Sequence, residues 1–163
     1  MPVEILTGDC REMLAPLPAG AARCCVTSPP YFGLRDYGAV GQLGQESTPD
    51  EYVAALVTVF RDVRRVLADD GTLWLNLGDS YCNTDKWGGG GNLGKNTVAA
   101  DGPVPSWAVR RKRGKMPGIK PKDLLMIPAR VALALQADGW YLRSHIIWHK
   151  PNPMPESVRD RPT

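Results

Sequence analysis

Short β-favouring runs alternate with helical patterns along the chain, and this alternation limits the possible fold more than any other feature of the sequence. We expect strands at residues 3–6, 23–27, 72–77 and 140–149, because each is apolar, short and closed by turn-forming residues. A helical pattern falls between each strand and the next. This order predicts an α/β domain with a mainly parallel sheet.

Boundary signals locate the three helices. Asp9 is placed to cap the first. The second is the best marked, because residues 48–51 (Thr-Pro-Asp-Glu) form a capping box and Gly71 closes the apolar pattern that follows. The third is expected to begin at Pro128 and to stop at Gly139.

Composition favours a globular protein. The 163 residues suit a single domain, and 43% hydrophobic with 23% charged residues excludes a disordered tail or a fibre. No apolar run reaches the ~20 residues that span a bilayer, and the N-terminus lacks the regions of a secretory signal. The four cysteines are spaced for neither zinc nor a disulfide framework, so we expect reduced thiols in a cytoplasmic protein without a metal site.

Residues 84–122 form a basic, Gly/Pro-rich insertion. They hold nine basic and two acidic residues, a net charge of +7, whereas the whole chain carries +3. Composition alone favours a solvated loop, and the alternative is a surface that contacts nucleic-acid phosphates, with Trp87 and Trp107 as stacking groups. The densest basic run consists of Arg110, Arg111, Lys112 and Arg113.

Polar or proline-rich turns follow each predicted strand. They contain Asp9, residues 28–31, Asp79 and residues 150–152. Because ligands bind beyond the carboxyl ends of strands in such sheets, we expect a site at this edge.

The most informative turn is Ser28-Pro29-Pro30-Tyr31. The two prolines stiffen it and remove N–H donors, so it presents a hydroxyl, bare carbonyls and an aromatic ring. This set suits a planar ring with an exocyclic amino group, which would stack on Tyr31 while Ser28 and Pro29 accept its hydrogens. Drawing the nitrogen toward tetrahedral geometry frees its lone pair to attack an activated methyl group. The plainer alternative is a Pro-Pro turn with a core tyrosine.

The segment VTSPPY resembles the catalytic motif of the amino-methylating DNA methyltransferases, in the form associated with cytosine-N4 enzymes. Adenine-N6 relatives usually have Asp or Asn in place of Ser28. SPPYFGLRDYG, TLWLNLGDSY and IIWHKPNPMPESVRDR also resemble family segments, so the likeness covers most of residues 1–83 and 120–163. It implies a Rossmann-like fold with helices on both sheet faces, S-adenosyl-L-methionine as cofactor and double-stranded DNA as substrate.

The resemblance also implies residue roles. Ser28, Pro29, Pro30 and Tyr31 would be catalytic, and Asp9 together with Ser28 would contact the cofactor. Residues 84–122, with their basic run, would contact the target DNA. The same role would extend to Lys150 and Asn152, at the pocket for the flipped base.

One family feature is absent from the sequence. The Phe-x-Gly-x-Gly loop that wraps the methionine part of the cofactor should follow the last strand, but no such pattern occurs. We therefore expect the N-terminal catalytic part of an enzyme, completed by a missing C-terminal segment or a second chain. Cytosine N4 is the first expectation for the target; the alternatives are adenine N6 and a nucleic-acid-binding fragment without catalysis.

Overall fold

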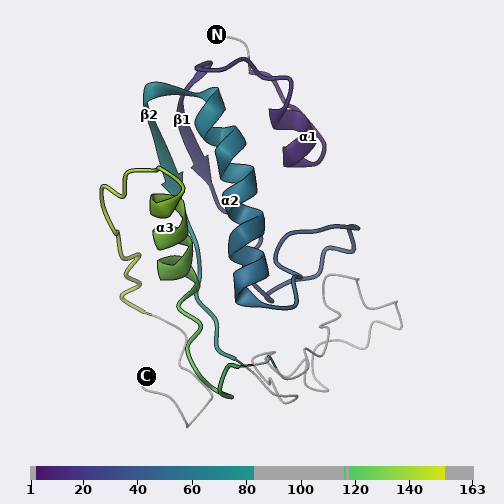
Figure 1. Cartoon of the computed structure of the whole chain (residues 1–163), viewed down its shortest axis with the longest axis vertical. Coiled ribbons are helices and arrows are strands. Elements are labelled where there is room, and N and C mark those ends of the chain that lie inside the picture. Colours follow the sequence, from purple (N-terminus) through teal and green to yellow (C-terminus); the bar gives the residue numbers. More distant parts are fainter. Residues whose placement is uncertain (1–2, 83–115, 117, 153–163) are drawn as a thin grey trace.

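Three helices and two strands make up the described part of the chain (Figure 1). The structure is a computed structural model that describes residues 3–82, 116 and 118–152. In chain order the elements are α1 (Cys10–Leu14), β1 (Ala22–Thr27), α2 (Pro49–Val66), β2 (Leu67–Leu75) and α3 (Ile127–Ala137). Most of the predicted insertion, including its basic run at 110–113, lies outside the described residues.

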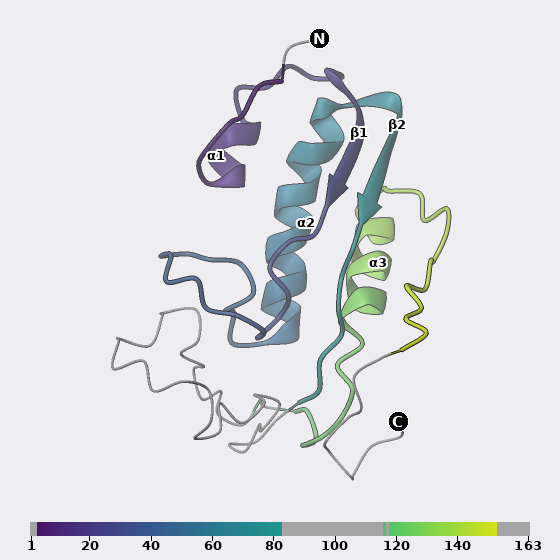
Figure 2. The ribbon, with the colours of Figure 1, turned by 180° about the vertical axis from the view of Figure 1, so that it is seen from behind.

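The two strands pair in parallel, as predicted. The register runs from Ala22 opposite Leu67 to Thr27 opposite Leu75, with an irregularity after Ala22. Figures 1 and 2 show α2 and α3 on the same side of this pair. On the other face, within the described part, Val26 is 79% and Trp74 53% exposed. The helices that the resemblance implies for both faces are therefore present on one, because no described element packs against Val26 and Trp74.

Helix α2 begins as the sequence predicts. The Thr48 side chain accepts a hydrogen bond from the Glu51 N–H (3.2 Å), and the Glu51 carboxylate accepts one from the Thr48 N–H (3.1 Å). Pro49 occupies the first turn, where no N–H is required. These reciprocal bonds satisfy donors that a helix start otherwise leaves unpaired.

The end of α2 differs from the prediction. The helix stops at Val66, not at Gly71, and the chain passes directly into β2. Leu67 has extended backbone (φ −72°, ψ 142°) and pairs with Ala22. Pairing with β1 therefore decides where the helix ends, and β2 runs over 67–75 where residues 72–77 were expected.

The core lies between α2, α3 and the inner face of the sheet. Its fully buried side chains include Tyr52 and Leu56 on α2 and Ile127 and Val131 on α3. Helix α3 ends where predicted, since Gly139 follows it with φ +99°. Helix α1 is capped by Asp9 as expected and packs against α2.

Two predicted strands do not form. Residues 3–6 and 140–149 are described, and neither segment belongs to a strand. A strand requires a neighbour to satisfy its backbone groups, and β1 and β2 pair only with each other in the described part of the chain. Most apolar side chains of both segments are consequently exposed, including Ile5 at 83% and Trp148 at 77%, whereas Trp140 packs against the core.

The structure gives the state of the cysteines, the lengths of the helices and the grouping of potential metal ligands. All four cysteines are free thiols. In the part of the chain that the structure describes, no helix has the length and apolar character needed to cross a membrane. The same residues contain no group of three or more potential metal-ligating side chains.

Candidate active site

The Ser28-Pro29-Pro30-Tyr31 turn leaves β1 directly and opens onto a pocket. The Thr27 carbonyl accepts a hydrogen bond from the Asn76 N–H (2.9 Å), which holds the start of the turn beside the end of β2. The pocket has a volume of about 330 Å³ and is lined by the turn together with Leu34, Arg35 and Tyr37. That volume lies within the range of roughly 300–1,000 Å³ typical of small-molecule sites.

The turn presents two hydrogen-bond acceptors. The Ser28 hydroxyl donates to the Tyr31 Oη (3.2 Å), so lone pairs of the Ser28 oxygen remain to accept hydrogen bonds. The Pro30 carbonyl accepts from the Tyr52 hydroxyl (2.9 Å). In contrast, no described residue donates to the Pro29 carbonyl. The Ser28 oxygen and the Pro29 carbonyl therefore both keep capacity to accept hydrogen bonds, and their expected contact with an amino group stays a prediction.

Tyr52 supports the turn from helix α2. Its ring is fully buried and packs against Phe32, with ring centroids 5.5 Å apart. Burial raises the pKa of Tyr52, and Glu46 and Tyr31 raise it further. The hydroxyl therefore stays protonated and continues to donate to the Pro30 carbonyl.

Replacement of Tyr52 by phenylalanine is expected to lower the free energy of unfolding by about 0.5–1.5 kcal/mol, because the hydrogen bond to the Pro30 carbonyl is lost. Urea unfolding followed by circular dichroism measures this change. The matched control is Tyr141→Phe, since Tyr141 is 86% exposed and should leave stability unchanged. Equal stability of the Tyr52→Phe and Tyr141→Phe proteins would contradict the assigned support.

The pocket wall is held by side-chain amides. Gln42 donates to the Arg35 carbonyl (2.8 Å) and accepts from the Tyr37 N–H (2.6 Å). Gln45 donates to the same Arg35 carbonyl (2.6 Å). These three bonds fix the backbone that carries two of the pocket-lining residues.

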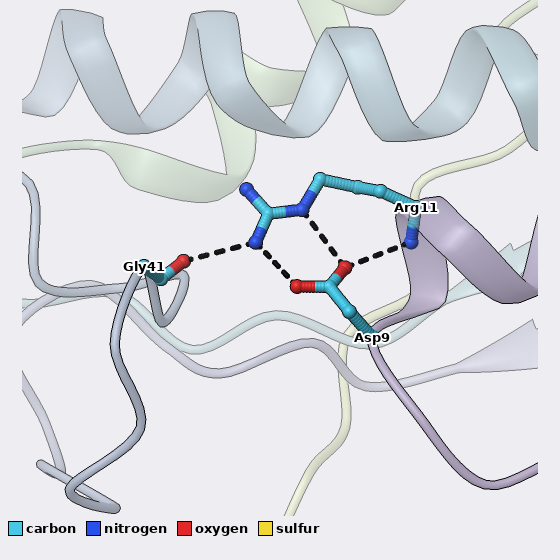
Figure 3. Close-up of polar contacts among 3 residues, drawn as sticks. All are labelled: Asp9, Arg11 and Gly41. Carbon is cyan, nitrogen blue, oxygen red and sulfur yellow. Dashed lines mark hydrogen bonds and ion pairs between the residues drawn. The ribbon is translucent and has the colours of Figure 1, made fainter.

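Asp9 forms an ion pair that reaches the same loop (Figure 3). Its Oδ1 accepts from the Arg11 backbone N–H (2.9 Å) and from Nε (2.8 Å), and its Oδ2 accepts from Nη2. Arg11 also donates to the Gly41 carbonyl (3.2 Å). The hydrogen bonds and charge of Arg11 lower the pKa of Asp9 to about 2. Asp9 therefore remains ionised and orients Arg11, which ties α1 to the loop that contains Gly41.

The other predicted site residues lie apart from the pocket. The Asp79 carboxylate accepts hydrogen bonds from the N–H groups of Ser80 (2.8 Å) and Ile127 (3.0 Å). Asp79 therefore stabilises the first residue of α3. Lys150 and Asn152 are exposed, and neither lines the pocket. The basic run at 110–113 lies outside the described residues, so its predicted role stays a prediction.

Sequence reasoning missed several residues of the site. Tyr52 was overlooked, although it lies four positions before Leu56 and therefore on the buried face of the same helix. Tyr37 lies within the segment SPPYFGLRDYG, but its own place in the pocket wall was not predicted. Gln42 carries no sequence signal, because polar loop residues are common, and its role follows from the loop backbone that it holds.

Comparisons with known proteins show the family to which this chain belongs. Residues 22–163 match the model of the DNA methylase family N6_N4_Mtase. The Type II methyltransferase M.Cfr9I of Citrobacter freundii is 52% identical over 159 residues, 98% of this chain and 50% of that protein. M.SmaI of Serratia marcescens is 51% identical over 160 residues, 98% of this chain and 52% of that protein.

One solved structure also matches the chain. A candidate DNA modification methylase from Thermus thermophilus, solved with S-adenosyl-L-methionine, is 21% identical and has a TM-score of 0.49. The match covers 91% of this chain and 48% of that one. The chain spans about half the length of the curated relatives it matches. Because the family model matches residues 22–163, the chain belongs to the DNA methylase family.

Proposed function

We propose that this chain carries the target-base site of a DNA methyltransferase that acts on the N4 amino group of a flipped-out cytosine. The observation that carries this proposal is the turn after β1, where Ser28 and Pro29 offer acceptors beside the Tyr31 ring in one pocket. The target base must leave the duplex, which costs a few kcal/mol. Stacking on Tyr31 would return about 1–3 kcal/mol.

The residues of the turn would activate the amino nitrogen. Ser28 Oγ and the Pro29 carbonyl accept its two hydrogens and localise its lone pair, which otherwise is conjugated into the ring. The nitrogen then forms its bond to the methyl carbon as the bond from that carbon to sulfur breaks, and one amino proton is released. Positive charge develops on the nitrogen during this step, and the two acceptors stabilise it.

Ser28 supports cytosine N4 over adenine N6. This preference rests on the resemblance of the serine form of the motif to cytosine-N4 enzymes. Methylation of adenine N6 by the same turn is the second candidate, since the acceptors of Ser28 and Pro29 suit either amino group.

Asp9 has room for one contact with the cofactor. A carboxylate offers about four lone-pair sites, and Arg11 fills three of those on Asp9. The Asp9 side chain is 34% exposed, so one further hydrogen bond to a hydroxyl or amino group fits. We propose Asp9 and Ser28 as the residues of this chain that hold S-adenosyl-L-methionine, which supplies the activated methyl group when bound.

We further propose that the rest of the enzyme completes the sheet. The exposed apolar residues of segments 3–6 and 140–149 need neighbouring strands, and the chain spans only half of its relatives. A C-terminal segment or a second chain would supply those strands and the glycine loop of the cofactor site. Residues 84–122, with Lys150 and Asn152, would contact DNA. The Type II relatives favour a role in restriction-modification. The cytoplasm is the location that we propose, on the cysteine spacing of the sequence.

A chimera tests the proposed activity. It joins this chain to the half of M.Cfr9I that the chain does not match, in the order in which M.Cfr9I carries its halves. With labelled S-adenosyl-L-methionine and genomic DNA, we expect the chimera to label DNA and either half alone to label none. A folded chimera that binds DNA without transferring methyl groups would contradict the proposal and favour a nucleic-acid-binding role.

A further inference from the structure

Gly78 touches the aromatic ring of the turn across the parallel strands. It follows β2 by three residues, whereas Tyr31 follows β1 by four. A Cβ atom on Gly78 would lie 2.8 Å from Tyr31 Cε2 and 2.9 Å from Cδ2. Real Cβ atoms do not approach other atoms this closely, so a side chain at position 78 requires a shift of the Tyr31 ring or of the backbone that carries Gly78.

The glycine is required by this contact, not by its backbone conformation. Gly78 is absent from the glycines with positive φ, so an alanine would adopt its backbone without strain. Gly78 does not line the pocket, whereas Tyr31 does. Tyr31 therefore links the two, because its ring meets Gly78 at Cδ2 and Cε2 and also forms part of the pocket wall.

We propose that Gly78 is the positioning residue of Tyr31. It backs the ring, which fixes the depth at which Tyr31 presents its surface to a base and keeps Oη within 3.2 Å of Ser28 Oγ. A methyl group at position 78 displaces the ring from this place in the pocket wall and disturbs the contact between these two oxygens. This inference rests on the proposed function for its consequence in catalysis, but the contact itself does not.

Fluorine NMR of the 163-residue chain labelled with 3-fluorotyrosine tests the contact. Tyr31→Phe assigns the signal of Tyr31. We expect Gly78→Ala to shift that signal and to leave those of Tyr52 and Tyr141 in place. The matched control is Gly71→Ala, which also brings a Cβ within 2.8 Å of a neighbour, the Ala68 carbonyl, and should leave the Tyr31 signal unmoved. An unshifted Tyr31 signal in Gly78→Ala would overturn the proposal.

A double-mutant cycle covers the case in which Gly78→Ala folds poorly. If the methyl group acts through the ring, Gly78→Ala lowers the melting temperature of the wild-type chain but not that of the Tyr31→Ala chain. Equal losses in both backgrounds would show that position 78 acts through its own backbone, which would overturn the assignment.

The same cycle in the chimera measures the catalytic consequence. Gly78→Ala should lower kcat for methyl transfer by roughly 5- to 150-fold, the size of one lost stacking contact, and should have no further effect beside Tyr31→Ala. Equal losses of kcat in both backgrounds would contradict positioning. If the chimera transfers no methyl group at all, the proposed function fails, while the NMR and melting experiments still decide the role of Gly78.

Discussion

Replacement of Ser28 by alanine is expected to lower methyl transfer by the chimera by about 10²–10³-fold, the typical cost of removing one group that stabilises charge in a transition state. The Ser28 hydroxyl donates to Tyr31 and leaves its oxygen free to accept from the target amino group. Alanine removes that acceptor and leaves the backbone of the turn unchanged. Initial rates with labelled cofactor and genomic DNA measure the loss.

Ser47→Ala is the matched control for this prediction. Ser47 is exposed, and its hydrogen bond to Glu51 uses the backbone N–H, which alanine keeps. The control should transfer methyl groups at the wild-type rate. Wild-type activity of the Ser28→Ala chimera would show that the Ser28 hydroxyl takes no part in methyl transfer and would contradict the proposed mechanism.

The second large effect is expected in segment 140–149. Ile146 is 66% exposed in this chain, so Ile146→Ser should leave the stability of the 163-residue chain unchanged. In the chimera, where we propose that neighbouring strands cover the segment, the same change should cost about 1.5–3 kcal/mol. Urea unfolding of both proteins, each with and without the substitution, measures the difference.

Leu56→Ala provides the reference for that comparison. Leu56 is fully buried on α2, so its truncation should cost about 2–5 kcal/mol in the chain and in the chimera alike. If Ile146→Ser has the same small effect in both proteins, the segment stays uncovered and the proposed completion of the sheet is wrong.

The elements that could be predicted are those whose signals are local. The capping box at Thr48 and Glu51 and the glycine after α3 are decided within a few residues, and both lie where the sequence placed them. The end of α2 depends on the pairing of Leu67 with Ala22, 45 residues earlier, and no local pattern contains that information. The pattern at 140–149 predicts a strand, but a strand forms only beside a neighbouring strand. Among the described residues β1 and β2 pair with each other, and neither pairs with this segment.

The candidate site shows the same division. Ser28 and Tyr31 are neighbours in sequence, so their shared chemistry could be predicted from four consecutive residues. Tyr52 reaches Pro30 from a helix 22 residues away, and Gly78 reaches Tyr31 only because β1 and β2 are parallel and in this register. Contacts of this second kind require the fold, and they are the ones that hold the turn in shape.

Nucleoside analysis of DNA methylated by the chimera tests the central claim most directly. Genomic DNA is treated with the chimera and cofactor, digested to nucleosides and separated by chromatography with mass detection. We expect N4-methyldeoxycytidine, because the serine form of the turn resembles that of cytosine-N4 enzymes. N6-methyldeoxyadenosine as the only methylated nucleoside would contradict that assignment.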